Sequence, residues 1–239
     1  MRVVRVWMAV AVTLAALSGC TGDDSPAEVP VSASASAPAT ETGPTPSYAP
    51  EKVASVKVPA AVAKKYGAAE ARKAYRLAAD VTSDYTFRRS LMESKAAYTV
   101  EDFAGPETAM TARAAQEWNG YVAKAVAGDA VAQNAVSALS YFKIEREGFA
   151  LVAGDPLVVN ESVTGAVLSV DAEKTGSEAL KVDLTYEAQI RYVSGGQRWR
   201  LPVTKTASYW MVPEQGGWKI DAFLVNYQTS AAVSDVAGG

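Results

Sequence analysis

The residue whose type and position could do chemistry is Cys20, the only cysteine among 239 residues. It follows Leu17, Ser18 and Gly19 near the amino terminus. A single cysteine cannot form a disulfide within the chain, and it cannot build a zinc or iron–sulfur site from thiolates. The chemistry assigned to Cys20 therefore depends on the residues that precede it.

The residues before Cys20 have the features of an export signal. Arg2 and Arg5 form a short positive region, and the run from Val6 to Leu17 is almost entirely apolar. A helix needs ~20 apolar residues to span a bilayer, so this run is too short. We therefore expect residues 1–19 to be a secretory signal that is later removed. The two arginines are not adjacent, which favours general export over the twin-arginine route.

The tetrapeptide Leu17-Ser18-Gly19-Cys20 resembles the lipobox of bacterial lipoproteins at all four positions. The resemblance implies that Cys20 receives a diacylglyceryl group, that cleavage falls between Gly19 and Cys20, and that Cys20 becomes the mature amino terminus. Two acyl chains give a stable membrane anchor where one gives only marginal binding. The predicted location is the outer face of the cytoplasmic membrane, and the head of the chain resembles lipoproteins of high-GC Gram-positive bacteria.

A spacer is expected between Cys20 and the folded part of the chain. Half of residues 21–50 are proline, serine or threonine, and such a segment cannot bury enough apolar surface to fold. We expect residues 20–58 to be the lipidated cysteine and a disordered tether with a root-mean-square span of ~30–35 Å. The folded domain is expected at residues 60–228, followed by a frayed tail at 229–239.

Two counts exclude much of enzyme chemistry. The chain has no histidine, which removes the usual general base near neutral pH, the histidine-activated nucleophiles and the commonest metal ligand. The net charge of −3 gives no basic footprint for nucleic acid. The sequence holds no glycine-rich phosphate loop, calcium loop or nucleophile elbow. We therefore expect no cofactor, no metal site and no nucleic-acid partner.

Helical periodicity predicts that the first part of the domain is α-helical. Three segments have apolar residues at spacings of three and four: Ala71, Ala74, Ala78, Val81 and Tyr85; Met110, Ala114, Trp118, Tyr121 and Ala125; and Val131, Ala135, Leu139 and Phe142. Weak helix formers at 81–84 predict a bend in the first segment. Thr99 with Asp102 predicts a capping box on a short helix that ends at Gly105-Pro106, and Asp129 predicts the cap of the last helix.

After Gly148 the period changes to two, which predicts strands. The clearest strand runs from Leu180 to Tyr192, where apolar and polar residues alternate as in a sheet with one packed and one solvated face. Ser194 to Gln197 predicts a tight hairpin turn. Further strands are expected at 149–152, 157–170, 199–212 and 218–227. The predicted fold class is α+β, with N-terminal helices packed on a curved antiparallel sheet of about four long strands.

Helices followed by a curved antiparallel sheet, ending in Gly217-Trp218-Lys219-Ile220-Asp221, resemble the NTF2-like (cystatin-like) superfamily over roughly residues 66–228. The resemblance implies a cone-shaped pocket between sheet and helices. Some members isomerise, dehydrate or hydrolyse small apolar ligands, and others only bind or assemble. Members similar to ketosteroid isomerase use a carboxylate base with a tyrosine and a neutral acid. No tyrosine partner can be assigned here, so the resemblance transfers no catalytic residue.

Four residues are candidate ligand contacts of the domain. Trp210 follows Thr204, Thr206 and Ser208 on the polar side of its strand, and a large aromatic on a polar stripe can mark a binding patch. Trp118 and Tyr186 either line a cleft or pack in the core. Asp221 is interpreted as a solvated or ion-paired carboxylate rather than a base. Simple alternation places it with Lys219, Phe223 and Val225, opposite Trp218, Ile220, Ala222 and Leu224.

Three functions stay open at this point. The favoured prediction is a non-enzymatic, lipid-anchored module that binds a small apolar ligand or a neighbouring envelope protein. One alternative is a pocket enzyme of isomerase, dehydratase or hydrolase type that uses carboxylates and tyrosines. The other alternative is a structural subunit of an envelope or export assembly. A homodimer that forms through the solvated face of the sheet would favour this alternative.

Overall fold

The computed structural model describes residues 53–93, 97–142, 150–152, 156–172, 174–176 and 178–235. The predicted signal, Cys20 and most of the predicted tether lie outside these residues. The described part is an α+β domain in which helices precede an open antiparallel sheet of six strands, which confirms the predicted fold class at this level. None of the described helices is long and apolar enough to cross a membrane.

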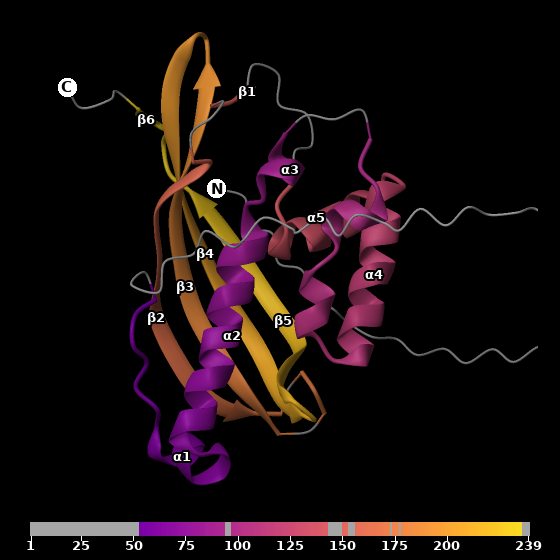
Figure 1. Cartoon of the computed structure of the whole chain (residues 1–239), viewed down its shortest axis with the longest axis vertical. Helices are drawn as coiled ribbons and strands as arrows, with labels where there is room; N and C mark the ends of the chain where they lie inside the picture. The colour runs from indigo at the N-terminus through magenta and orange to yellow at the C-terminus, as the bar shows by residue number, and fades with distance from the viewer. Residues whose placement is uncertain are drawn as a thin grey trace, which may run out of the picture. The chain divides into compact units, whose positions relative to one another are not determined.

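The helical elements occupy the first half of the domain and the strands the second (Figure 1). The helices are α1 (Ala60–Tyr66), α2 (Ala68–Thr86), α3 (Arg89–Met92), the 3-10 helices η2 (Val100–Phe103) and η3 (Pro106–Ala109), α4 (Ala112–Val126) and α5 (Ala130–Leu139). The strands are β1 (Ala150–Leu151), β2 (Val158–Asp171), β3 (Ala179–Ser194), β4 (Gln197–Glu214), β5 (Gly217–Thr229) and β6 (Val233–Ser234).

The long strands form an up-and-down sheet in the order β2, β3, β4, β5. The turn between β3 and β4 is the predicted hairpin, in which Gly195 and Gly196 both have positive φ. The two short strands extend the sheet near this hairpin, β1 against β3 and β6 against β4. One register line runs across three strands: Tyr186 lies opposite Lys205, and Lys205 lies opposite Tyr227.

One face of the sheet packs against α2, which contacts β2, β3 and β5 and lies lengthwise along the strands (Figure 1). The side chains of Lys205 and Tyr209 on β4 bond to residues of α2. Alternate residues of β4 therefore lie on the opposite face, which we call the open face. The helices α4 and α5 contact β5 and each other.

Two predictions about the helices need correction. The first helix continues without interruption to Thr86, although 81–84 were expected to bend it. The hydroxyl of Thr82 donates to the carbonyl of Ala78 at 2.8 Å, which satisfies this polar group inside the helix. Ala135, Leu139 and Phe142 are buried as predicted, but Val131 is 71% exposed, because the buried stripe of α5 begins at Ala132 and includes Val136.

The predicted faces of β5 are also partly wrong, because the strand contains a bulge. Trp210 lies opposite Ala222 while Met211 lies opposite Ile220, so Asp221 is the extra residue. A bulge shifts the alternation of side chains by one residue. Phe223 and Val225 therefore join Ile220 and Trp218 on the α2-facing side, and Ala222 and Leu224 lie on the open face.

The domain is longer at both ends than predicted. Residues 53–58 were assigned to the tether, but Val53 pairs with Val163 of β2 and Val56 is only 8% exposed. The hydroxyl of Tyr75 donates to the carbonyl of Ala54 at 2.8 Å. Within the tail that was expected to fray, β6 pairs with β4, and Asp235 forms ion pairs with Arg191 and Arg200.

Candidate functional site

The structure does not gather the four predicted ligand contacts into one site. Trp118 and Tyr186 are fully buried in the core, where the Trp118 ring packs edge-on against Phe223. Trp210 lies on the open face but is only 3% exposed, with the ammonium of Lys181 above its ring. Trp210 therefore offers almost no exposed surface to the binding patch that its position on the polar stripe predicted.

The open face carries a shallow hollow of about 180 Å³. Five polar side chains from three strands contribute to its lining, namely Asp183, Thr185, Thr206, Ser208 and Asn226, together with Gly165, Leu184, Ala207 and Leu224. The hydroxyl of Ser208 donates to the carboxylate of Asp183. Groups of this kind bind a partner through hydrogen bonds at the surface, and the hollow is too small and too open to enclose a drug-sized ligand.

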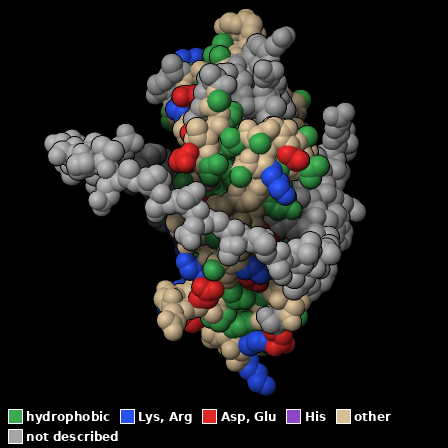
Figure 2. All heavy atoms as spheres, turned by 90° about the vertical axis from the view of Figure 1, so that its right-hand side faces the viewer, with side chains coloured by type: hydrophobic (Ala, Val, Ile, Leu, Met, Phe, Trp, Pro, Cys, Tyr) green, Lys and Arg blue, Asp and Glu red, His purple; other side chains and the backbone are tan. Residues whose placement is uncertain are grey.

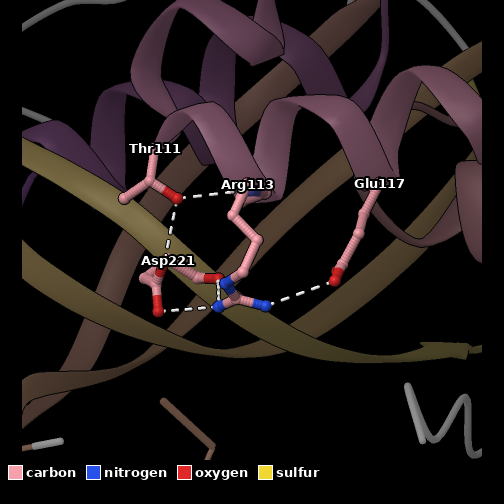
Figure 3. A network of polar contacts seen from close by, with 5 residues as sticks. Thr111, Arg113, Glu117 and Asp221 are labelled. Atoms are coloured by element: carbon pink, nitrogen blue, oxygen red, sulfur yellow. Dashed lines mark hydrogen bonds and ion pairs between the residues drawn. The ribbon is translucent and has the colours of Figure 1, made fainter. Parts of the chain in front are cut away.

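Asp221 holds the start of α4 against the bulge of β5 (Figure 3). The hydroxyl of Thr111, which caps α4, donates to Asp221 Oδ1 at 2.8 Å. The guanidinium of Arg113 donates to Asp221 Oδ2 at 2.7 Å and to its carbonyl at 2.8 Å, and it also reaches Glu117. The carboxylate is therefore fully engaged in structural bonds, in line with its interpretation as an ion-paired group.

The most unusual polar group of the domain is Lys205, which the sequence reading missed. Its side chain is 0% exposed and lies on the α2-facing side of β4, among apolar and aromatic residues. Its ammonium nitrogen donates to Thr86 Oγ1 at 2.7 Å. Lysine is almost never fully buried without a partner of opposite charge, because removing its charge from water is costly.

A chain of hydroxyls on α2 connects Lys205 to the rest of the core. Thr86 donates its own hydroxyl proton to the carbonyl of Thr82, so its oxygen is left to accept from Lys205. Thr82 likewise donates to Ala78, and its oxygen lies 2.7 Å from the hydroxyl of Tyr209. Both threonines therefore present an acceptor to the sheet, and β4 supplies the two donors.

Aromatic rings surround the lysine. Tyr186 and Tyr227 are its cross-strand neighbours, and its nitrogen lies 5.6 Å from the centroid of the Tyr227 ring, within cation–π distance. Phe87 packs within 6.5 Å of the rings of Tyr141, Tyr186 and Tyr227. We call Phe87, Tyr141, Tyr186 and Tyr227 the aromatic shell.

Burial sets the protonation of this centre. It lowers the pKa of Lys205 to about 7, so that the amine is partly neutral near physiological pH. Burial also raises the pKa of Tyr227 far above its ordinary value, so this phenol stays protonated. A desolvated amine in an apolar site can act as a base, a nucleophile or a binding group for an anion.

Two carboxylates, Asp84 of α2 and Glu161 of β2, lie near each other beside the aromatic shell. The hydroxyl of Tyr186 donates to Glu161 Oε1 at 2.8 Å. Burial, together with the negative charges of Asp80 and Glu161, raises the pKa of Asp84 to about 6. This arrangement of carboxylates and a tyrosine was not visible in the sequence, because its members come from α2, β2 and β3.

One signal in the sequence could have revealed Lys205. The residues Leu201, Val203, Ala207, Tyr209 and Met211 form the apolar alternate of β4, and Lys205 occupies the middle of that stripe. A charged residue on a buried alternate must find a polar partner or shift its pKa. The sequence alone does not say that Thr86, 119 positions earlier, is that partner.

The described surface on the α4 side of the domain is mixed in character. Figure 2 shows basic, acidic and hydrophobic side chains interspersed over the described residues on that side of the domain.

Comparisons of the chain with protein-family models, with curated proteins and with solved structures find no match. The functional argument therefore depends on the chain's own residues.

The Asp221 network predicts a measurable contribution to stability. Replacing Asp221 with alanine removes the acceptor of the Thr111 hydroxyl and the carboxylate partner of Arg113, so we expect the free energy of unfolding to fall by about 1–3 kcal/mol. Urea denaturation measures this. The Glu117→Gln substitution is the control, because its exposed pair with Arg113 contributes only ~0–1 kcal/mol. An unchanged stability in Asp221→Ala would contradict a structural role and return Asp221 to the ligand candidates.

The buried lysine predicts that stability rises with pH. Between pH 7 and 9 the unfolded chain keeps the Lys205 proton that the folded chain has released, so the free energy of unfolding increases by about 2 kcal/mol. We expect Lys205→Met to be more stable than the wild type at pH 7 and to lose this pH dependence. Urea denaturation at both pH values checks the prediction, with Lys181→Met on the open face as the matched control. Equal pH profiles for wild type and Lys205→Met would show that Lys205 is not desolvated.

Proposed function

We propose that the protein is a lipid-anchored extracytoplasmic lipoprotein whose folded domain is a binding module. The observation that carries the proposal is the Leu17-Ser18-Gly19-Cys20 motif, placed after a short apolar run and before a Pro/Ser/Thr-rich spacer. Acylation of Cys20 anchors the chain to the outer face of the cytoplasmic membrane, and the spacer holds the domain away from the lipid.

The character of the domain supports binding rather than catalysis. The hollow on the open face offers hydroxyl, amide and carboxylate groups at the surface, which suits a partner recognised by hydrogen bonds. Asp221, an acid on the final strand, is tied to α4 by its hydrogen bonds. The order of helices and sheet is also compatible with the NTF2-like architecture, in which many members bind or assemble without chemistry.

A pocket enzyme is the second candidate, and one observation favours it. Asp84 has a pKa raised to about 6, and Glu161 beside it accepts a hydrogen bond from Tyr186. A carboxylate with a pKa near the working pH is suited to general acid–base catalysis. This candidate uses carboxylates and a tyrosine, and it requires a substrate to reach the edge where α2 crosses β2.

The anchor predicts the behaviour of one substitution. Cys20→Ser removes the sulfur that carries the lipid, so we expect the protein to leave the membrane fraction. Ser18→Ala keeps the motif within the lipobox pattern and is the matched control, which should stay with the membrane. Fractionation of the two variants and the wild type by immunoblot measures this. Retention of Cys20→Ser in the membrane fraction would refute the anchor.

The binding role predicts that the protein carries a partner. Native mass spectrometry of the full-length protein, released gently from its host membrane in non-ionic detergent, should show an added mass that survives mild ionisation. A protein found only as a bare monomer would contradict the small-ligand form of the proposal. A homodimer without further mass would instead favour the structural-subunit alternative.

A further inference from the structure

The hydrogen-bonding groups around Lys205 are incompletely matched. When charged, the Lys205 ammonium has three N–H groups to donate, and among the described residues the Thr86 hydroxyl accepts from it. Among the described residues, no carboxylate forms an ion pair with Lys205, and burial is the cause of its lowered pKa. A buried cation without an anion is costly, whereas a paired and hydrogen-bonded one is tolerated.

Two buried hydroxyls near Lys205, those of Tyr227 and Ser140, have no hydrogen-bond partner among the described residues. Tyr227 faces Lys205 across the strands, and its buried hydroxyl lies beside Thr86 without completing a hydrogen bond of normal geometry. Ser140 has a second buried hydroxyl, for which the described residues provide no hydrogen-bond partner. The next residue, Tyr141, donates its backbone N–H to the carbonyl of Thr86 at 2.9 Å, so Ser140 is anchored near the same turn of α2.

The aromatic shell gives this point an apolar wall and a way to the surface. Tyr186 is fully buried and Phe87 is 8% exposed, whereas Tyr227 is only partly buried although its hydroxyl oxygen is buried. Tyr141 is partly buried as well, so Tyr141 and Tyr227 are the members of the shell that solvent reaches. Rings of this kind pack against an aromatic or aliphatic body while a few polar groups fix its orientation.

We propose that Lys205, with the hydroxyl of Tyr227 and the aromatic shell, forms a binding site for a small carboxylate on an apolar body. The carboxylate accepts from the lysine ammonium and from the Tyr227 hydroxyl, and the apolar body packs against the rings of Phe87 and Tyr141. The ligand supplies the negative charge that the described residues do not place beside Lys205.

Binding of a carboxylate must be coupled to protonation of the lysine. In the free protein the Lys205 amine is mostly neutral at pH 8, because its pKa is about 7. An adjacent anion favours the charged form, so the complex takes up close to one proton at pH 8 and almost none at pH 6. The other titratable groups around the lysine are Tyr186, Tyr227 and Tyr141, and burial raises the pKa of Tyr227 far above these pH values. Glu161 lies behind Tyr186, whose hydroxyl donates a hydrogen bond to the Glu161 carboxylate.

The test uses benzoate and hexanoate as probes, with benzamide as the uncharged isostere of benzoate. Isothermal titration calorimetry of the full-length protein, in two buffers of different ionisation enthalpy, gives both affinity and proton uptake. We expect the two carboxylates to bind at millimolar concentration or below, with proton uptake at pH 8 that disappears at pH 6. Benzamide should bind at least tenfold more weakly, because it lacks the charge.

Three variants locate the site. Lys205→Met should weaken the binding of benzoate by roughly ten- to a hundredfold and abolish proton uptake. Tyr227→Phe removes one hydroxyl and should weaken it by roughly threefold, which keeps the test valid if Lys205→Met folds poorly. Lys181→Met on the open face should bind as the wild type does. The proposal is overturned if neither carboxylate binds, if benzamide binds as well as benzoate, or if Lys205→Met binds unchanged. Membrane release of Cys20→Ser is independent of all these outcomes.

Discussion

The interface between α2 and the sheet depends on two polar contacts within an apolar layer. Thr82 meets Tyr209 and Thr86 meets Lys205, one helical turn apart. Each threonine hydroxyl donates its proton to a carbonyl of α2, so in each contact the threonine oxygen accepts and the residue of β4 donates. A valine of similar shape at either position would leave a buried donor of β4 unmatched, which costs more than the bond itself contributes. These contacts set where along the sheet the helix lies.

The local features of the fold were predictable from the sequence. The capping box of Thr99 and Asp102 and the cap at Asp129 are present, because each depends on residues three positions apart. The Gly195-Gly196 turn fixes the β3–β4 register, and strict alternation from Leu180 to Ile190 identifies the packed face of β3. Such patterns are written in neighbouring residues, so no tertiary information is needed to read them.

The candidate sites were less predictable, because they depend on distant partners. The bulge at Asp221 follows from its bonds to Thr111 and Arg113, more than a hundred positions away, and alternation therefore assigned the second half of β5 to the wrong faces. Lys205 stands out on its stripe, but its partners come from α2, β3 and β5. Trp210 was read correctly as lying on the polar alternate, yet Lys181 and neighbouring strands leave it almost no exposed surface.

Both outer strands of the sheet are interrupted in ways that bear on aggregation. The edge of β2 is bridged by Val53 and broken by two register shifts, and the edge of β5 is bridged by Met110 beside its bulge. Exposed, regular edges are templates for strand addition by another molecule, and bulges and bridging segments remove that template. The lipid anchor that we propose would concentrate copies of the protein on a membrane surface, where they would meet often. Edges interrupted in this way offer no continuous template, which disfavours the joining of sheets from neighbouring copies.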